Sequence, residues 1–178
     1  MRRLFLASSA LLALASCSTP EVAPAPAPPA PLPAPTPAPA PRPAPTPALG
    51  ADWRDWPLTP GTWAYRQDGR GSIALFGRAG TDADLTLRCD RGRGQLYLSR
   101  AGEGFATLTV RTSTDRKAIP VTSTGGVPPY MAAELTPRDS LVDSMGFSRG
   151  RFVVQASGMP DLVLPAWPEI LRVAEDCR

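Results

Sequence analysis

The chain of 178 residues contains no histidine and a single lysine, Lys117. Without imidazole there is no Ser-His-Asp or Cys-His arrangement and no histidine ligand for a metal. No Ser-x-x-Lys motif precedes Lys117, which argues against a Ser-Lys hydrolase. The glycine-rich segment 91–94 precedes an expected strand and lacks the Lys-Ser/Thr of a phosphate-binding loop, so we interpret it as a turn. The sequence therefore predicts a non-enzymatic protein without a metal or cofactor.

Long hydrophobic runs are also missing. The run from Leu4 to Ala15 follows two arginines and is too short to cross a hydrocarbon layer of about 30 Å, so residues 1–16 are predicted to be a cleaved secretory signal. The segment Leu14-Ala15-Ser16-Cys17 at its end resembles the lipobox of bacterial lipoproteins, whose cysteine sulfur receives a diacylglyceryl group. This resemblance implies that Cys17 is the lipidated first residue of the mature protein.

Ser18 stands where the inner-membrane retention signal of that family would place an aspartate. The resemblance therefore implies an outer-membrane location, with a membrane attachment through the lipid and the rest of the chain facing the periplasm. The alternative is an ordinary secretory signal. In that case Ala13 and Ala15 would be the small residues of an A-x-A cleavage site, and a soluble product would begin at Ser16.

The segment after the lipobox is dominated by alanine and proline, with 14 prolines in the 29 residues from Pro20 to Ala48. Proline removes a backbone donor and fixes φ, so neither a helix nor a sheet ladder is expected there. Residues 17–49 are thus predicted to be a disordered, extended stalk that acts as a spacer. A ligand for a proline-recognising module is the alternative, although the aromatic or basic flanks that give such ligands specificity are missing.

Residues 50–178 have the size of one globular domain. This part carries 16 basic and 15 acidic residues, a net charge of +1. A nearly neutral domain with interspersed signs lacks the broad positive field that holds phosphate backbones, so nucleic acid is not an expected partner.

Two cysteines remain once Cys17 is acylated, namely Cys89 and Cys177. An even number in an oxidising compartment predicts a disulfide. Two buried thiols or a redox pair are the alternatives, but the C-x-x-C spacing of a redox pair is missing. A metal site would need more ligands than two sulfurs.

Short segments with alternating apolar residues predict a mostly β fold. The expected strands are 62–66, 72–76, 84–89, 95–100, 105–112, 151–156 and 161–164, with further strands around Ile119 to Val121 and over 130–135. The inward rows are predicted to be Ile73 and Leu75; Leu85, Leu87 and Cys89; Leu96 and Leu98; Leu108 and Val110; and Phe152 and Val154.

Two helices are expected beside these strands. Thr136 and Pro137 predict the N-cap and first residue of a short internal helix that ends at Gly146, and a C-terminal helix is expected from Trp167 to Asp176. The predicted fold class is all-β or β-rich α+β, as an antiparallel sandwich or small barrel with these two helices.

Three groups of side chains in the domain could carry function. Arg149 and Arg151 flank a glycine and could clamp an anion; the alternative is that they pair with Asp143 or Glu175. Tryptophans at the start of the domain could form a binding surface or cover the open end of the core. They are Trp53, Trp56 and Trp63. Carboxylate pairs could act as acid and base or bind calcium, but are better explained as solvated surface. They are Asp82 with Asp84, Asp139 with Asp143, and Glu175 with Asp176.

The domain as a whole resembles a group of proline-rich lipoproteins of Gram-negative bacteria to which no activity is assigned. Segments 61–65, 72–77, 87–90, 148–152, 164–170 and 175–178 carry the likeness. We expect a lipid-anchored, non-enzymatic binding or structural module of the bacterial cell envelope whose partner is an envelope protein or a cell-wall component. The alternatives are an inhibitor of lysozyme-type enzymes, although the Ser-Gly-x-x-Tyr loop of such inhibitors is missing, and a carboxylate-dependent hydrolase.

Overall fold

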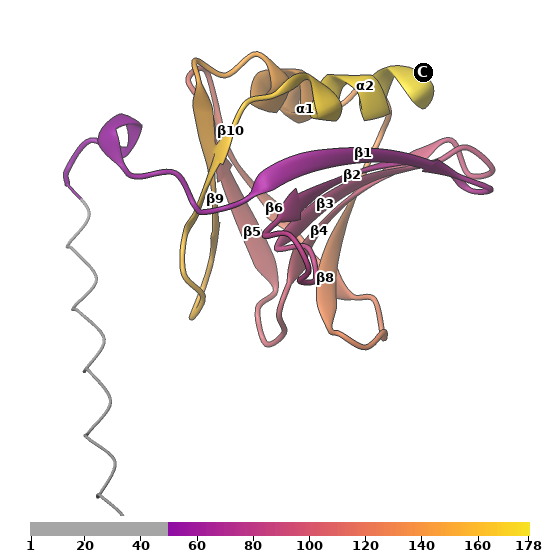
Figure 1. The fold of residues 1–178 in the computed structure, drawn as a ribbon, viewed down its shortest axis with the longest axis horizontal. Coiled ribbons are helices and arrows are strands. Elements are labelled where there is room, and N and C mark those ends of the chain that lie inside the picture. The colour runs from indigo at the N-terminus through magenta and orange to yellow at the C-terminus, as the bar shows by residue number, and fades with distance from the viewer. Residues whose placement is uncertain (1–49) are drawn as a thin grey trace, which may run out of the picture. The chain divides into compact units, whose positions relative to one another are not determined.

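The computed structural model describes residues 50–178, so the predicted signal 1–16, the lipidation site Cys17 and the stalk 17–49 lie outside the described residues. The described chain folds into two antiparallel sheets that pack face to face as a sandwich, with two helices (Figure 1). The predicted β-rich sandwich with one short internal helix and a C-terminal helix is confirmed.

The strands follow the turn signals of the sequence closely. In chain order the elements are η1 (Trp53–Asp55), β1 (Thr62–Asp68), β2 (Gly71–Gly77), β3 (Leu85–Asp90), β4 (Gln95–Ala101), β5 (Thr107–Arg111), β6 (Arg116–Pro120), β7 (Thr122–Ser123), β8 (Tyr130–Leu135), α1 (Ser140–Gly146), β9 (Arg151–Ala156), β10 (Leu162–Pro165) and α2 (Pro168–Asp176). The six-stranded sheet has the order β1-β2-β3-β4-β8-β7, and the four-stranded sheet has the order β10-β9-β5-β6.

The two sheets are tied together at both of their edges. At one edge only Val121 separates β6 from β7, so a nearly continuous segment passes from the small sheet to the large one. At the other edge Thr59, just before β1, makes two hydrogen bonds to the backbone of Val163 in β10. Its amide donates to the carbonyl of Val163 over 2.8 Å, and its hydroxyl accepts from the amide of Val163 over 2.9 Å. These links fix how the sandwich closes.

The core lies between the sheets, and the inward rows were predicted correctly on β3, β4, β5 and β9. On β2 the prediction of which residues face inward is wrong. Ile73 and Leu75 are half-buried on the outer face, whereas Ala74 and Phe76 are completely buried. The register explains the reversal, because Ala74 pairs with the inward Leu87 and Phe76 with the inward Leu85. A shift of one residue would move every β2 side chain to the other face.

The helices close the core on one side. In Figure 1, α1 and α2 lie together above the strands, and α2 packs on β1, β2 and β3. As predicted, α2 buries Ile170, Val173 and Ala174 on one face. The predicted cap of α1 is wrong: Asp139, not Thr136, is the N-cap, and its carboxylate accepts from the amide of Leu141 over 2.9 Å. No helix within residues 50–178 is both long and apolar enough to cross a bilayer.

Candidate functional site

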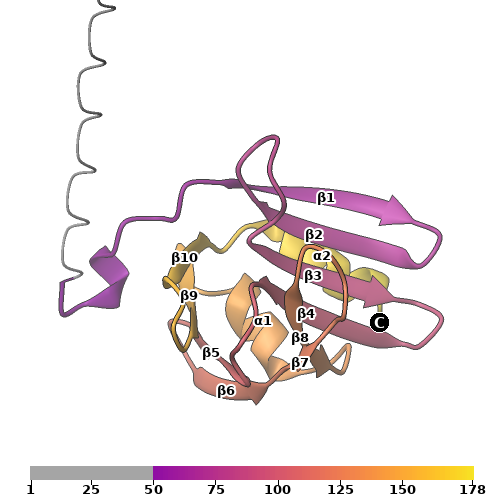
Figure 2. The same ribbon diagram turned by 90° about the horizontal axis from the view of Figure 1, so that it is seen from below.

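The outer face of the six-stranded sheet carries a groove that crosses the strands. Two adjoining hollows form it, with volumes of about 440 Å³ and 510 Å³. The hollows meet where Leu75 of β2 pairs with Thr86 of β3. In Figure 2, β1, β2 and β3 are seen from the side opposite α2, which is this face. We call this feature the cross-strand groove.

Short side chains, apart from Leu75, form the floor of the cross-strand groove. The register places one residue from each of the six strands in a single row: Ala64, Leu75, Thr86, Ser99, Ala132 and Thr122. Five strand spacings of about 4.8 Å give this row a length of roughly 24 Å. Three of the six floor residues carry a hydroxyl, which both donates and accepts hydrogen bonds. The floor is therefore long and shallow, with hydroxyls on β3, β4 and β7 and apolar side chains on β1, β2 and β8.

Long side chains form one wall of the cross-strand groove. The neighbouring row of paired residues is Arg66, Ile73, Arg88, Tyr97 and Glu134. Arg88 forms an ion pair with Asp68, whose carboxylate lies 2.8 Å from its guanidinium. Arg93 reaches the hydroxyl of Tyr97 over 3.4 Å. This wall combines positive charge with one aromatic ring.

Tyr130 and the loop between β2 and β3 form the opposite wall at the β1 end. The Tyr130 hydroxyl donates to the carbonyl of Ala83 over 2.5 Å, so the ring is tied to the loop 78–83. Burial raises the pKa of Tyr130, and the charges of Asp82 and Asp84 raise it further. The phenol therefore remains protonated and keeps the loop in place. Arg78 in this loop lines the hollow.

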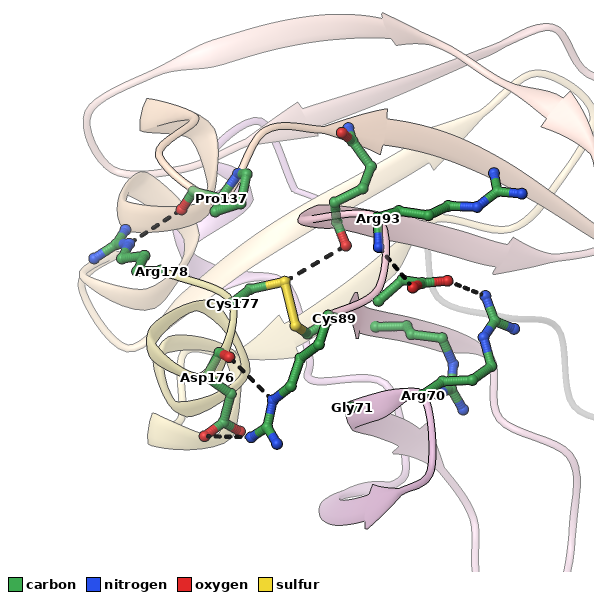
Figure 3. Close-up of a disulfide and its surroundings, with 12 residues drawn as sticks. Arg70, Gly71, Cys89, Arg93, Pro137, Asp176, Cys177 and Arg178 are labelled. Carbon is green, nitrogen blue, oxygen red and sulfur yellow. Dashed lines mark hydrogen bonds and ion pairs between the residues drawn. A yellow bond between two sulfur atoms is a disulfide. The ribbon is translucent and has the colours of Figure 1, made fainter.

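A second charged region surrounds the disulfide between Cys89 and Cys177, which the structure contains as the sequence predicted (Figure 3). The two Cα atoms lie 5.5 Å apart, and the bond joins the residue after α2 to β3 in the middle of the large sheet. Arg70 pairs with Asp90 over 2.7 Å on one side. On the other side Arg91 lies 3.8 Å from Asp176.

Hydrogen bonds keep three of the carboxylates around this region ionised. Bonds from Arg88 and Arg70 lower the pKa values of Asp68 and Asp90, respectively. Burial alone would raise the pKa of Asp176, but it is outweighed by the hydrogen bond from Tyr65, 2.6 Å long, and by the charges of Arg91 and Arg172, so the net change is a lowering.

Stability should therefore decline in acid. These carboxylates bind protons less readily in the folded than in the unfolded chain, where an aspartate has a pKa of about 3.9. Their contribution is complete above that value and is lost as the pH falls through the lower folded pKa values. We expect the melting temperature to drop between about pH 5 and about pH 2. The double variant Asp68→Asn/Asp90→Asn should show a shallower drop, and an unchanged slope would contradict this assignment.

The anion contact predicted for Arg149 and Arg151 stays a prediction. The Arg151 guanidinium donates to the backbone carbonyl of Trp56, and the side chain of Arg149 is exposed. The alternative, in which these arginines pair with Asp143 or Glu175, is wrong, because it is Arg178 that pairs with Asp143, over 2.5 Å, and with Glu175, over 2.8 Å.

The other acidic candidates are mostly engaged in structural contacts. Asp139 caps α1 and pairs with Lys117 over 3.1 Å. Asp143 and Glu175 share Arg178, and Asp176 accepts from Tyr65. Within residues 50–178 no three acidic or cysteine side chains lie close enough together to hold a metal ion. The pairs Asp139 with Asp143 and Glu175 with Asp176 are thus explained by packing and charge pairing. The third pair, Asp82 with Asp84, makes no ion pair within residues 50–178, and Asp82 lines one of the two hollows.

The tryptophans form no exposed binding surface. Trp53 is buried against Val153 and Val163, so that η1 covers the outer face of the small sheet rather than the open end of the core. Trp63 lies in the main core and donates to the carbonyl of Pro165 over 2.9 Å. Trp56 is half-buried beside Trp53. Both of the roles predicted for this group are therefore corrected.

Sequence reasoning missed the cross-strand groove altogether. Its residues are single members of six strands, and no local motif marks them. Comparison with family models, curated proteins and solved structures finds no match for this chain. The function is therefore inferred from the groove.

Proposed function

We propose that the protein is a lipid-anchored, non-enzymatic binding module of the bacterial envelope. Cys17 attaches it to the outer membrane, residues 17–49 act as a spacer, and the domain receives a cell-wall component on its periplasmic side. The observation that carries the proposal is the cross-strand groove, which two adjoining hollows form on the outer face of the six-stranded sheet. The lipobox resemblance supports the location.

The contacts of the acidic side chains favour binding over catalysis. A hydrolase that uses carboxylates needs one acid free to transfer a proton and a second free to attack or to activate water. The pairs Asp139 with Asp143 and Glu175 with Asp176 are instead held by Lys117, Arg178 and Tyr65. The contacts of these two pairs favour recognition over catalysis.

The location is tested by metabolic labelling with a clickable fatty acid. The full chain should incorporate label and fractionate with the outer membrane, and Cys17→Ala should lose both properties. A secreted, unlabelled wild-type chain would exclude the anchor. The matching variant Ser18→Ala should still be labelled, since the lipid is attached to the sulfur of Cys17.

Binding is tested by co-sedimentation of the full chain, purified in detergent, with isolated cell-wall sacculi. Ser99→Trp places a large ring on the groove floor and should reduce binding at least tenfold. Thr107→Trp makes the same change at an exposed position of β5 in the other sheet and should have no effect. Equal binding by both variants would exclude the groove. Inhibition of lysozyme by the wild-type chain, without binding to sacculi, would support the inhibitor hypothesis instead.

A further inference from the structure

We propose that the ligand of the cross-strand groove is a linear glycan that carries carboxylates, held with its chain across the strands and its acidic groups toward Arg66 and Arg78. This inference rests on the proposed function and names the chemical class of the ligand. It is carried by the shape of the groove, its hydrogen-bonding groups and its charge.

The shape fits a polymer better than a compact small molecule. The floor crosses all six strands, and the two hollows adjoin along it instead of forming one deep cavity. Sites for drug-sized molecules are concave and mostly apolar. Here the floor offers the hydroxyls of Thr86, Ser99 and Thr122 in one row. A row of groups that both donate and accept matches a ligand that presents hydroxyls at regular intervals along its length.

The groove is poorly suited to a peptide or a protein surface. Extended peptides bind at the free edge of a sheet, where backbone groups are unpaired. The groove instead crosses the face, where the backbone groups of the inner strands are paired with their neighbours. Protein interfaces are anchored by buried apolar and aromatic side chains. The large exposed apolar side chains within residues 50–178 are Leu58, Val127, Phe147 and Trp167, and none lines the groove.

The charge of the groove favours an acidic ligand. Five arginines line the two hollows, against two acidic residues, Asp82 and Glu134. Arg70 and Arg88 are already paired with Asp90 and Asp68 at the rim. No carboxylate of residues 50–178 lies within ion-pair distance of the other three, which are Arg66, Arg78 and Arg93. Arginine binds carboxylates with two parallel hydrogen bonds, which gives direction as well as attraction.

Tyr97 supplies the remaining element of glycan recognition. Its half-buried ring lies in the wall next to Ser99, and its hydroxyl accepts from Arg93 over 3.4 Å. A tyrosine ring whose hydroxyl edge reaches solvent offers an apolar face to a sugar ring and a hydrogen-bonding group to the hydroxyls of the sugar. Hydroxyls on the floor, an aromatic ring in the wall and arginines from the β1 end to the β3–β4 turn together define the ligand class.

The test compares two linear oligosaccharides of equal length by titration calorimetry with the full chain in detergent. Hyaluronan oligosaccharides carry a carboxylate on alternate sugars, and chito-oligosaccharides carry none. We expect hyaluronan to bind at least tenfold more tightly, which corresponds to ~1.4 kcal/mol. The difference should shrink at high salt, because screening weakens exposed charge pairs.

Two arginine variants complete the experiment. Arg66→Gln should weaken hyaluronan binding by about tenfold and leave chito-oligosaccharide binding unchanged. Arg116→Gln removes an exposed arginine from β6 in the other sheet and should change neither. Equal affinity for both glycans would overturn the acidic preference. Binding to sacculi but to neither glycan would overturn the glycan assignment and leave the proposed function standing, whereas binding to none of them would remove both.

Discussion

Replacement of Cys177 with serine should lower the free energy of unfolding by about 4 to 5 kcal/mol, because the disulfide closes a loop of 88 residues and restricts the unfolded chain accordingly. The loss is a large share of the 5 to 15 kcal/mol that typically holds a folded domain together. Cys177 is the better position for the substitution, because Cys89 is completely buried and a serine there would bury a hydroxyl as well. Urea denaturation measures the change.

Reduction of the wild-type protein provides the control for this prediction. With dithiothreitol present the wild-type chain should unfold at the same urea concentration as Cys177→Ser, and the variant should not respond to the reductant. A reductant-insensitive wild type would contradict the prediction. A thiol assay on the unfolded, unreduced chain should detect no free Cys89 or Cys177.

Replacement of Arg100 with methionine should cost about 2 to 4 kcal/mol, since hydrogen bonds to a charged group contribute about 1.5 to 3 kcal/mol each. Arg100 is 4% exposed on the inner face of β4. Its guanidinium donates to the carbonyls of Asp84, Ala101 and Pro160 over 3.1 to 3.3 Å, and so joins the two sheets at one end of the sandwich. Burial lowers the pKa of Arg100, which shows that its charge is held at a cost.

Two opposing terms decide the size of this effect. Methionine removes the desolvation cost of a buried charge, and such replacements are sometimes neutral. It also takes the guanidinium donors away from the carbonyls of Ala101 and Pro160. Each of these carbonyls then lowers the stability by about 1 to 3 kcal/mol if no water replaces the donor. Arg78→Met is the matched control, because Arg78 lies in an exposed loop and should change stability by less than about 0.5 kcal/mol. An Arg100→Met variant as stable as the wild type would show that the charge is not kept for stability.

The strands, the helices and the disulfide could be predicted from the sequence because each leaves a local signal. Alternating residues mark β3 and β4, and Trp167-Pro168-Glu169 marks the start of α2. The phase of β2 could not be predicted locally, since Ser72 to Gly77 offers an apolar residue at nearly every position. There the register with β3 decides, because it places Phe76 opposite Leu85.

The site could not be predicted because it depends on pairing between distant segments. Ala64 and Ala132 lie in one row of the groove only once six strands are in register. The partners of charged side chains are equally non-local. Arg151 follows Gly150, which suggested an anion-binding turn, yet its guanidinium donates to the backbone carbonyl of Trp56, 95 residues earlier. Charge motifs in a sequence therefore indicate candidates, whereas the fold assigns their contacts.

The last helix of the chain covers the first strands. Because α2 packs on β1, β2 and β3 and is joined to β3 by the disulfide, a chain that ended before residue 168 would lack the buried face formed by Ile170, Val173 and Ala174. Synthesis delivers the N-terminal segments first, so the sheet that forms early is closed only once the final residues have been made. A shortened chain would therefore leave apolar surface uncovered that the complete chain buries.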